Sequence, residues 1–245
     1  MKKIVIVGAS SGMGLQIAHD FAIMGWRVGM AARHTEPMAA LKEKFPEQIE
    51  YAELDVTATD AEKRFYDLVE KMDGMDTMLY CAGCGWNNPE LDETRDMQTL
   101  ETNVIGSTKI VNAAYKYYKA TANVTPGQIA AITSIAGTKG IGISATYSAS
   151  KRYQSIYLQA IDQLAHQQHV DVNVTEIRPG FVETPFLSTA TSNYPMTMPV
   201  EYACRKIERA ILLRRHRVTV DSRWAIVTAL WRLIPAPLWR HIGLK

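Results

Sequence analysis

Residues Lys3 to Gly14 read KIVIVGASSGMG, a β-branched run followed by a glycine-rich turn and the start of a segment with helical periodicity. Valine and isoleucine favour a strand, and Gly8 allows the tight turn that must follow it. Gly12 and Gly14 let the backbone approach a pyrophosphate, which the positive end of the next helix attracts. A strand, turn and helix in this order predict a dinucleotide-binding site. The predicted contacts are Gly8, Ser10, Ser11, Gly12, Met13 and Gly14.

Short apolar runs alternate along the whole chain with longer segments of helical periodicity, which predicts βαβ units around a parallel sheet. Most runs are apolar throughout, as expected for strands that helices cover on both faces. No linker rich in Pro, Gly or Ser divides the series, so residues 1–245 are predicted to form one doubly wound α/β domain, a Rossmann fold of about seven strands. The predicted strands are Lys3–Val7, Arg27–Ala31, Ile49–Leu54, Thr77–Cys81, Gln128–Thr133, Asp171–Ile177 and Arg217–Val220.

Helices are predicted between these strands. In the first helix, Ile17, Phe21 and Met24 share an apolar face, and Gly25 ends the helix. The others are predicted near Met38–Phe45, Asp60–Met72, Met97–Thr121, Ala145–Gln168 and Val200–Arg214.

Charge and cysteine content exclude some classes of protein. The net charge of +2, from 27 basic and 25 acidic side chains, gives no reason to expect a nucleic-acid partner. Three cysteines do not form a disulfide framework, which favours a cytoplasmic setting, and the first apolar run is too short for an export signal. Cys81 and Cys84 form a C-x-x-C, but at a strand exit, where a redox pair is not expected. No second ligand pair is visible, so no metal site is predicted.

Further motifs follow the glycine turn in a fixed order. They are TNVIG around Asn103, TSIAG around Ser134, YSASK at Tyr147–Lys151 and RPGFVETP at Arg178–Pro185. Together with the G-x-x-x-G-x-G spacing of the turn, they resemble the short-chain dehydrogenase/reductase family in its compact single-domain form. The resemblance covers most of the chain up to Pro185.

The YSASK stretch is the predicted centre of the chemistry. Tyr147 and Lys151 lie about one helical turn apart, so an ammonium stands beside a phenol whose ordinary pKa is near 10. A nearby cation is expected to lower that pKa, which suits Tyr147 to act as general acid in reduction and general base in oxidation. Ser134 is expected to orient and polarise the substrate carbonyl.

The family resemblance adds further expectations. It implies an oxidoreductase that interconverts a carbonyl and a secondary alcohol by hydride transfer, with Lys151 on the nicotinamide ribose. It also implies that Asn103 holds a water linking Lys151 to solvent. Cofactor contacts are implied at Asp55, Val56, Ala82, Gly83, Asn103, Tyr147, Lys151, Pro179, Gly180, Val182 and Thr184.

The end of the second strand, GMAARH, bears on the choice of cofactor. Arg33 offers a planar donor fork to a 2′-phosphate, and no carboxylate stands beside it, so NADP(H) is favoured. NAD(H) stays open, because Arg33 could merely solvate a loop and Glu36 could reach the ribose.

Two loops are predicted to contact the substrate, Gly85–Pro89 and residues 186–199. The second carries Phe186, Leu187, Tyr194, Met196 and Met198, which favours a small to medium, partly apolar substrate, although these side chains could instead pack the loop down.

The tail, residues 223–245, is rich in Trp, Leu and Ile with arginines among them. Arg232, Pro235 and Pro237 exclude a spanning helix. Three roles stay open for it: a peripheral membrane contact, a subunit interface and a lid over the substrate cleft.

Other interpretations concern assembly and function. By resemblance, a homodimer or homotetramer is expected, although apolar helix residues can also simply cover the sheet. An NADP(H)-sensing binding protein without turnover and an epimerase-type relative are the alternative functions. The candidate interface residues are Val111, Ala114, Tyr118, Ile156, Tyr157 and Ala160.

Overall fold

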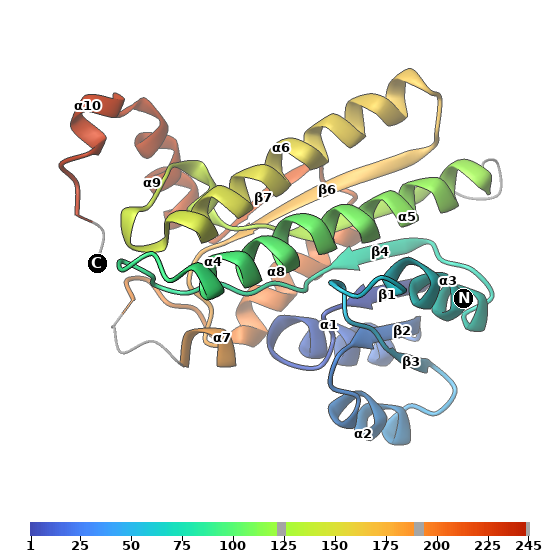
Figure 1. The fold of residues 1–245 in the computed structure, drawn as a ribbon. Helices are drawn as coiled ribbons and strands as arrows, with labels where there is room; N and C mark the ends of the chain where they lie inside the picture. Colours follow the sequence, from blue (N-terminus) through green and yellow to red (C-terminus); the bar gives the residue numbers. More distant parts are fainter. Residues whose placement is uncertain (122–125, 189–193, 244–245) are drawn as a thin grey trace.

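Seven parallel strands form the centre of the molecule, in the order β3-β2-β1-β4-β5-β6-β7 (Figure 1). The computed structural model describes residues 1–121, 126–188 and 194–243. Because the strand order reverses at β1, a crevice is expected at the carboxyl ends of β1 and its neighbour β4. The strands are β1 (Lys3–Val7), β2 (Arg27–Ala32), β3 (Ile49–Glu53), β4 (Thr77–Tyr80), β5 (Gly127–Ile132), β6 (Val172–Pro179) and β7 (Arg217–Val220).

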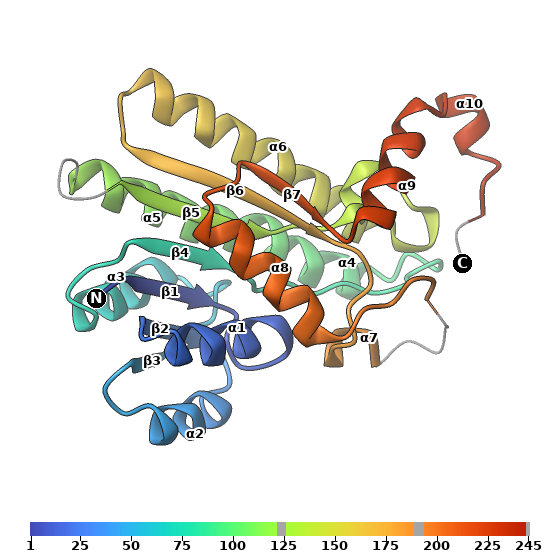
Figure 2. The same cartoon turned by 180° about the vertical axis from the view of Figure 1, so that it is seen from behind.

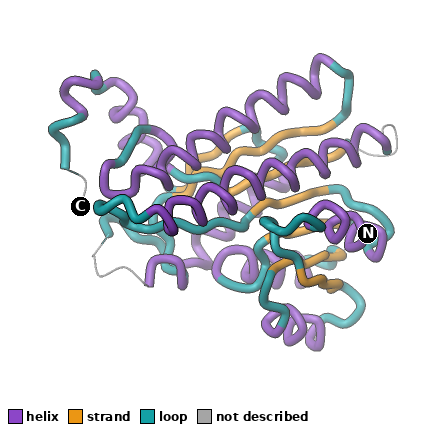
Figure 3. Tube along the Cα trace, viewed as in Figure 1, coloured by secondary structure: helices purple, strands orange, loops and turns teal. Residues whose placement is uncertain are grey.

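Helices cover both faces of this sheet, as Figures 2 and 3 show. One layer contains α1 (Gly12–Ile23), α2 (Glu36–Lys44) and α8 (Val200–Leu212); the other contains α3 (Ala61–Lys71), α5 (Ser107–Ala120) and α6 (Ala145–Gln167). The remaining helical segments are α4 (Glu93–Leu100), η1 (Glu101–Gly106), η2 (Ile135–Thr138), η3 (Gly142–Ser144), α7 (Pro185–Ser188), α9 (Ser222–Leu233) and α10 (Ala236–Trp239).

The strand side chains supply two cores. Along β1, Val5 and Val7 pack with α3 and α5, whereas Ile4 and Ile6 pack with α1 and α8. Successive side chains of a strand point to opposite faces, so an unbroken apolar run buries both faces of a parallel sheet. The predicted fold class and seven strands are therefore confirmed, with strand ends that differ from the predicted ones by at most two residues.

The first helix differs from its prediction at one position. Ile17 and Phe21 are fully buried, but Met24 is 47% exposed, so its placement on the apolar face is wrong. The helix ends at Ile23, so Met24 lies past its last turn. Gly25 then turns the chain with a φ of 78°.

The long helix predicted at Met97–Thr121 is interrupted by the π-helical segment η1. Its wider turns release backbone carbonyls from the regular ladder, and side-chain hydroxyls replace the lost donors. Ser107 Oγ donates to the Asn103 carbonyl at 2.6 Å, and Thr108 Oγ1 donates to the Val104 carbonyl at 2.7 Å. This segment is what turns Asn103 toward the interior.

Three of the candidate interface residues prove to be core residues. Val111, Ala114 and Tyr118 are buried against the sheet, which confirms for these three the alternative that they cover the sheet. Ile156 and Ala160 are exposed on α6, and the oligomeric state stays a prediction. Within the described residues, no helix is long and apolar enough to cross a membrane.

A buried carboxyl between α1 and α8 predicts a pH dependence of stability. Burial and the nearby carboxylate of Asp20 raise the pKa of Glu208, which is 4% exposed, above its ordinary value. The folded protein therefore binds this proton more tightly than the unfolded chain, so the free energy of unfolding falls as pH rises from about 4.3 toward the raised pKa.

We therefore expect Glu208→Gln to lose less stability than the wild type between pH 5 and pH 8.5, by about 1 kcal/mol or more. Urea unfolding at both pH values measures this difference. Glu201→Gln, an exposed change on the same helix, is the control. Identical pH dependence of Glu208→Gln and the wild type would contradict the prediction.

Candidate active site

A cavity of about 1120 Å³ opens at the carboxyl ends of the strands. Nearly all predicted site residues line it, although they come from segments far apart in the chain. The exceptions are Gly14 and Asn103, which do not line the cavity. Its predicted lining residues are Gly8, Ser10, Ser11, Gly12, Met13, Arg33, Asp55, Val56, Ala82, Gly83, Ser134, Tyr147, Lys151, Pro179, Gly180, Val182 and Thr184.

The glycine turn forms the floor of one end of the cavity. Gly8 has a φ of 94°, and a Cβ there would lie 2.4 Å from the Ala82 nitrogen, so only glycine fits. Helix α1 starts at Gly12 with no acidic residue in its first turn, and the Ser11 side chain does not cap it. Backbone N–H groups at this helix end are suited to bind phosphate.

Gly14 has a packing role. A Cβ at this position would lie 2.1 Å from the Gly8 carbonyl oxygen, so the absence of a side chain lets α1 sit against the turn. Gly14 does not line the cavity, and its contact with a cofactor stays a prediction. Gly14 allows α1 to pack directly against the backbone of Gly8.

The part of the cavity beside the glycine turn carries the positive charge of Arg33. Arg33 is exposed and lines the cavity beside His34, whereas Glu36 begins α2 and lies outside the lining. Asp55 is held at the edge, because its Oδ1 accepts from the N–H and hydroxyl of Thr57 at 2.9 and 2.8 Å. This end is therefore cationic toward the solvent and bounded by a fixed carboxylate.

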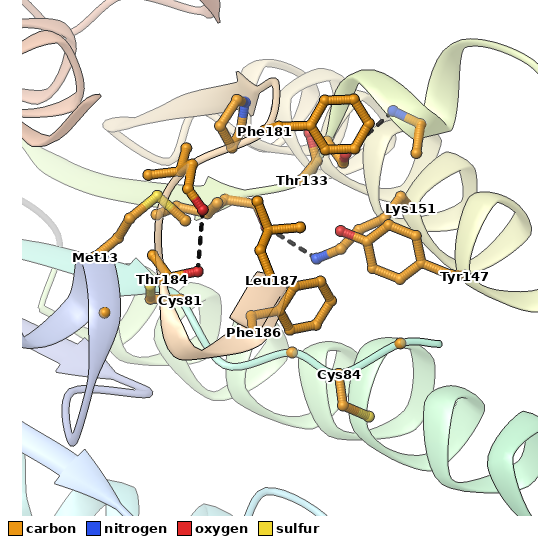
Figure 4. A pocket seen from close by; sticks show the side chains of 18 of the residues that line it. Met13, Cys81, Cys84, Thr133, Tyr147, Lys151, Phe181, Thr184, Phe186 and Leu187 are labelled. Atoms are coloured by element: carbon orange, nitrogen blue, oxygen red, sulfur yellow. Dashed lines mark hydrogen bonds between the residues drawn. The ribbon is translucent and has the colours of Figure 1, made fainter. Parts of the chain in front are cut away.

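Three of the four predicted catalytic residues line the cavity together, and they are Ser134, Tyr147 and Lys151. Ser134 follows β5, its Oγ accepts from the Ala136 N–H at 3.1 Å, and its hydroxyl hydrogen-bonds to Tyr147. Tyr147 and Lys151 come from the first turns of α6, and both project into the cavity (Figure 4). The Lys151 Nζ lies 5.7 Å from the centroid of the Tyr147 ring.

The ionisation of Tyr147 differs from the expectation. Burial raises its pKa to about 12, and the Ser134 hydroxyl, which works to lower it, only partly offsets that effect. The expected net lowering does not result, since burial is the largest influence on this pKa. The Lys151 ammonium donates to the Ile132 carbonyl at 3.2 Å and to Gln154 Oε1 at 3.0 Å. Burial also lowers the pKa of Lys151 to about 8.

Asn103 supports the site from outside the cavity. It is fully buried, its Oδ1 accepts from the Cys84 N–H at 3.0 Å, and its Nδ2 donates to the Cys84 carbonyl at 2.7 Å. Its carbonyl oxygen accepts from Gln154 Nε2 at 2.9 Å. Asn103 thus fixes the loop after β4 and reaches Lys151 through Gln154.

Several residues of the site are absent from the sequence prediction. Gly85 is one, since a Cβ there would lie 2.2 Å from Cδ2 of Tyr147. Gln154 is another, and its position three residues after Lys151, on the same face of a helix, was the available signal. Glu176 of β6 accepts from Arg178 on the same strand and from Arg217 at the start of β7, both at 2.7 Å, and so ties β6 to β7.

Both predicted substrate loops reach the cavity. From the first loop, Asn87 lines it, accepts from Ser144 Oγ at 2.8 Å and donates to the Tyr194 hydroxyl at 3.4 Å. From the second, Phe186 faces Tyr147 with ring centroids 5.8 Å apart (Figure 4). Residues 189–193 of that loop lie outside the described part of the chain.

Met198 does not belong to the cavity. It is 1% exposed and packs in the core, where its backbone N–H and carbonyl bond to Phe181 and Glu183. Its prediction as a substrate contact is wrong, because this end of the loop pairs with the strand-like segment around Val182.

The tail covers one side of the cavity. Trp224, Val227 and Trp231 of α9 line it. The Trp239 Nε1 donates to the Gly140 carbonyl at 2.7 Å, which ties α10 to the segment before α6. This arrangement favours the lid among the three predicted roles. The opposite face of α9 carries exposed Ile226, Leu230 and Leu233, so the membrane and subunit contacts stay predictions.

The C-x-x-C pair lacks the environment of a redox site. Burial raises the pKa of the Cys81 thiol to about 12, and it raises that of Cys84 as well. A thiol that resists ionisation is a poor nucleophile. Among the described residues, no cluster of three or more His, Cys, Asp or Glu side chains is arranged to hold a metal ion.

Comparisons with known proteins agree with this geometry. The family model described as short chain dehydrogenase matches residues 2–195. An oxidoreductase of Myxococcus xanthus is 30% identical over 96% of this chain and 93% of its own length. The YxnA oxidoreductase of Bacillus subtilis is 32% identical over 81% of this chain and 57% of its own length.

Solved structures show the same fold. ElxO with NADP bound superposes with a TM-score of 0.77 at 20% sequence identity, covering 92% of this chain and 99% of ElxO. A tyrosine-to-phenylalanine variant of ElxO with NADPH bound gives the same TM-score at 19% identity.

Proposed function

This chain belongs to the short chain dehydrogenase family, and we propose that it is an NADP(H)-dependent oxidoreductase interconverting a carbonyl and a secondary alcohol. One observation carries the proposal: Ser134, Tyr147 and Lys151 line the same cavity as the glycine turn. A phosphate-binding helix end and a proton donor in one cavity suit hydride transfer coupled to proton transfer.

The cavity fits a dinucleotide. The Gly8–Gly14 turn would hold the pyrophosphate at the start of α1, and Asp55 with Val56 would bound the adenine. Arg33 and His34 would face a 2′-phosphate, whereas Glu36 stands aside from the cavity. The Arg33 guanidinium supports NADP(H) over NAD(H), and the ElxO structures hold NADP and NADPH.

Tyr147 supplies the proton in reduction. Its pKa of about 12 keeps the phenol protonated near neutrality, which is the form that a general acid needs. A nicotinamide cofactor, when bound, would supply the hydride, and the phenolic proton of Tyr147 would go to the carbonyl oxygen. In the oxidation direction the phenolate of Tyr147 accepts the proton from the alcohol.

Ser134 and Lys151 assist this transfer. The Ser134 oxygen accepts from the Ala136 N–H, and its hydroxyl, which hydrogen-bonds to Tyr147 in this structure, would turn its proton to the substrate oxygen when a carbonyl is bound. The Lys151 ammonium, 5.7 Å from the phenol ring, stabilises the phenolate left after proton donation. Lys151 would also hold the nicotinamide ribose.

The substrate side of the cavity is mixed in polarity. Phe186, Leu187 and Met196 offer apolar contacts, and Asn87 with Tyr194 offers hydrogen-bonding groups. A small to medium, partly apolar carbonyl compound fits this lining. The indoles of Trp224 and Trp231 would cover it from the tail.

Removal of the phenolic hydroxyl tests the proposal directly. We expect Tyr147→Phe to lower kcat for carbonyl reduction by about 10³-fold, because general acid catalysis typically contributes 10²–10⁴-fold. NADPH binding, measured by fluorescence titration, should stay within about threefold of the wild type. Tyr153→Phe, an exposed position on the same helix, is the matched control. Full turnover by Tyr147→Phe would overturn the assignment.

A substitution at Arg33 tests the preference for NADPH over NADH. Loss of a charge-assisted contact of about 1.5–3 kcal/mol should weaken NADPH binding in Arg33→Ala by about 10- to 100-fold and leave NADH binding unchanged. Titration of both cofactors measures this, with Arg209→Ala on the far helix α8 as control. Equal effects on the two cofactors would show that Arg33 does not meet a 2′-phosphate.

A substitution at Gly85 tests how strictly the position of the Tyr147 ring controls activity. A methyl group at Gly85 would overlap the Tyr147 ring, whereas one at Gly140 would meet nothing within 4 Å. We expect Gly85→Ala to lower kcat at least about 10-fold through misplacement of the proton donor. Gly140→Ala should behave as the wild type. Equal kcat values for the two variants would refute this placement.

A further inference from the structure

A buried amide joins the two residues that the family resemblance links through water. Gln154 lies three residues after Lys151 on α6 and is 3% exposed. Its Oε1 accepts from Lys151 Nζ at 3.0 Å, and its Nε2 donates to the Asn103 carbonyl at 2.9 Å. Lys151 is 4% exposed and Asn103 is fully buried, so this bridge is shielded from solvent.

The chemistry of the two neighbours fixes the orientation of the amide. An ammonium can only donate and a backbone carbonyl can only accept, so the Gln154 oxygen must face Lys151 and its nitrogen must face Asn103. A glutamate could not donate to the carbonyl while ionised, and an apolar side chain could do neither. A side-chain amide of this length satisfies both groups at once.

The π-helical segment η1 leaves the Asn103 carbonyl available for this contact. Asn103 lies in η1, and its carbonyl oxygen also accepts from Ser107 Oγ at 2.6 Å. The Asn103 side chain is engaged by the Cys84 backbone and by Ser150 Oγ, at 3.0 Å from the latter. The direct bridge therefore reaches the residue at which the resemblance implies a water, through its backbone carbonyl.

We propose that Gln154 is a positioning residue of this site, one that holds the Lys151 ammonium against Asn103 and takes the place of a proton-conducting water. The proposal rests on the proposed oxidoreductase function. A water passes protons along its O–H bonds, whereas a primary amide does not release a proton near neutrality. The phenolate of Tyr147 is then reprotonated from the cavity, and Lys151 acts as a fixed charge.

The ionisation of Lys151 gives a test in the cofactor-free protein. The titratable groups facing Lys151 are the thiols of Cys81 and Cys84 and the phenol of Tyr147. All three stay neutral near pH 8, because burial raises their pKa values. Gln154 is therefore the neighbour whose replacement should move the titration of Lys151.

We expect opposite shifts in two variants. Gln154→Met keeps the volume but removes the acceptor, so the charged form loses a partner and the pKa of Lys151 falls below that of the wild type. Gln154→Glu adds a negative charge and should raise it. NMR of lysine-labelled protein measures both midpoints, with Lys151→Met to identify the resonance and Gln163→Met, an exposed change on α6, as control. Unchanged midpoints would overturn the proposal.

Kinetics test whether Gln154 takes the place of a proton-conducting water. Gln154→Met should lower kcat about 10-fold and move the alkaline limb of its pH profile downward. Gln154→Ala leaves room for a water, so it should retain more activity than Gln154→Met. A loss in Gln154→Ala as large as that in Gln154→Met would contradict the substitution for water. If the wild type itself shows no turnover, the proposed function fails, but the Lys151 titration still decides the role of Gln154.

Discussion

At the carboxyl end of the sheet, the backbone of Gly8 lies so close to the exit of β4 that a Cβ would come within 2.4 Å of the Ala82 nitrogen. The N–H groups of Cys81 and Ala82 both donate to the Val7 carbonyl, at 2.8 and 2.9 Å, so the two strand ends leave together. This close approach places the start of α1 and the loop after β4 at one crevice. The proposed phosphate-binding end and the proposed proton-transfer end of the site both depend on it.

Burial then decides the properties of the proposed proton-transfer part of the site, around Tyr147 and Lys151. Ser134 at the end of β5 and the first turns of α6 meet the loop after β4, where Gly85 leaves no space between backbone and the Tyr147 ring. Burial acts oppositely on the two ionisable groups, raising the pKa of Tyr147 and lowering that of Lys151. The site therefore keeps a neutral phenol beside an ammonium that hydrogen bonds hold in place.

Local patterns were sufficient to predict the fold. The β-branched runs mark strands buried on both faces, and the glycine turn with YSASK marks both halves of the site. Met24 and Met198 were misplaced because their contacts depend on how a helix end and a returning loop pack. Helical periodicity cannot show a π-helical interruption, so Asn103 was expected at the cavity instead of behind it.

Electrostatics were the least predictable part. Spacing placed Lys151 beside Tyr147, but it could not show that Ile132 and Gln154 take the hydrogen bonds of the ammonium. Gly85 and Gln154 lie near the motifs in sequence, yet their roles follow from contacts between separate elements. The sign of the Tyr147 pKa shift depends on burial, which a sequence pattern does not measure.

Transfer of a labelled hydride tests the central claim most directly. The protein is incubated with NADPH deuterated at the transferable C4 position and a panel of ketones, keto-sugars, steroids and ketoacyl thioesters, and the products are examined by mass spectrometry. The account predicts net cofactor oxidation and one deuterium on the carbinol carbon of a reduced substrate, with both lost in Tyr147→Phe. NADPH binding without label transfer to any substrate, or a changed stereocentre without net cofactor oxidation, would contradict it.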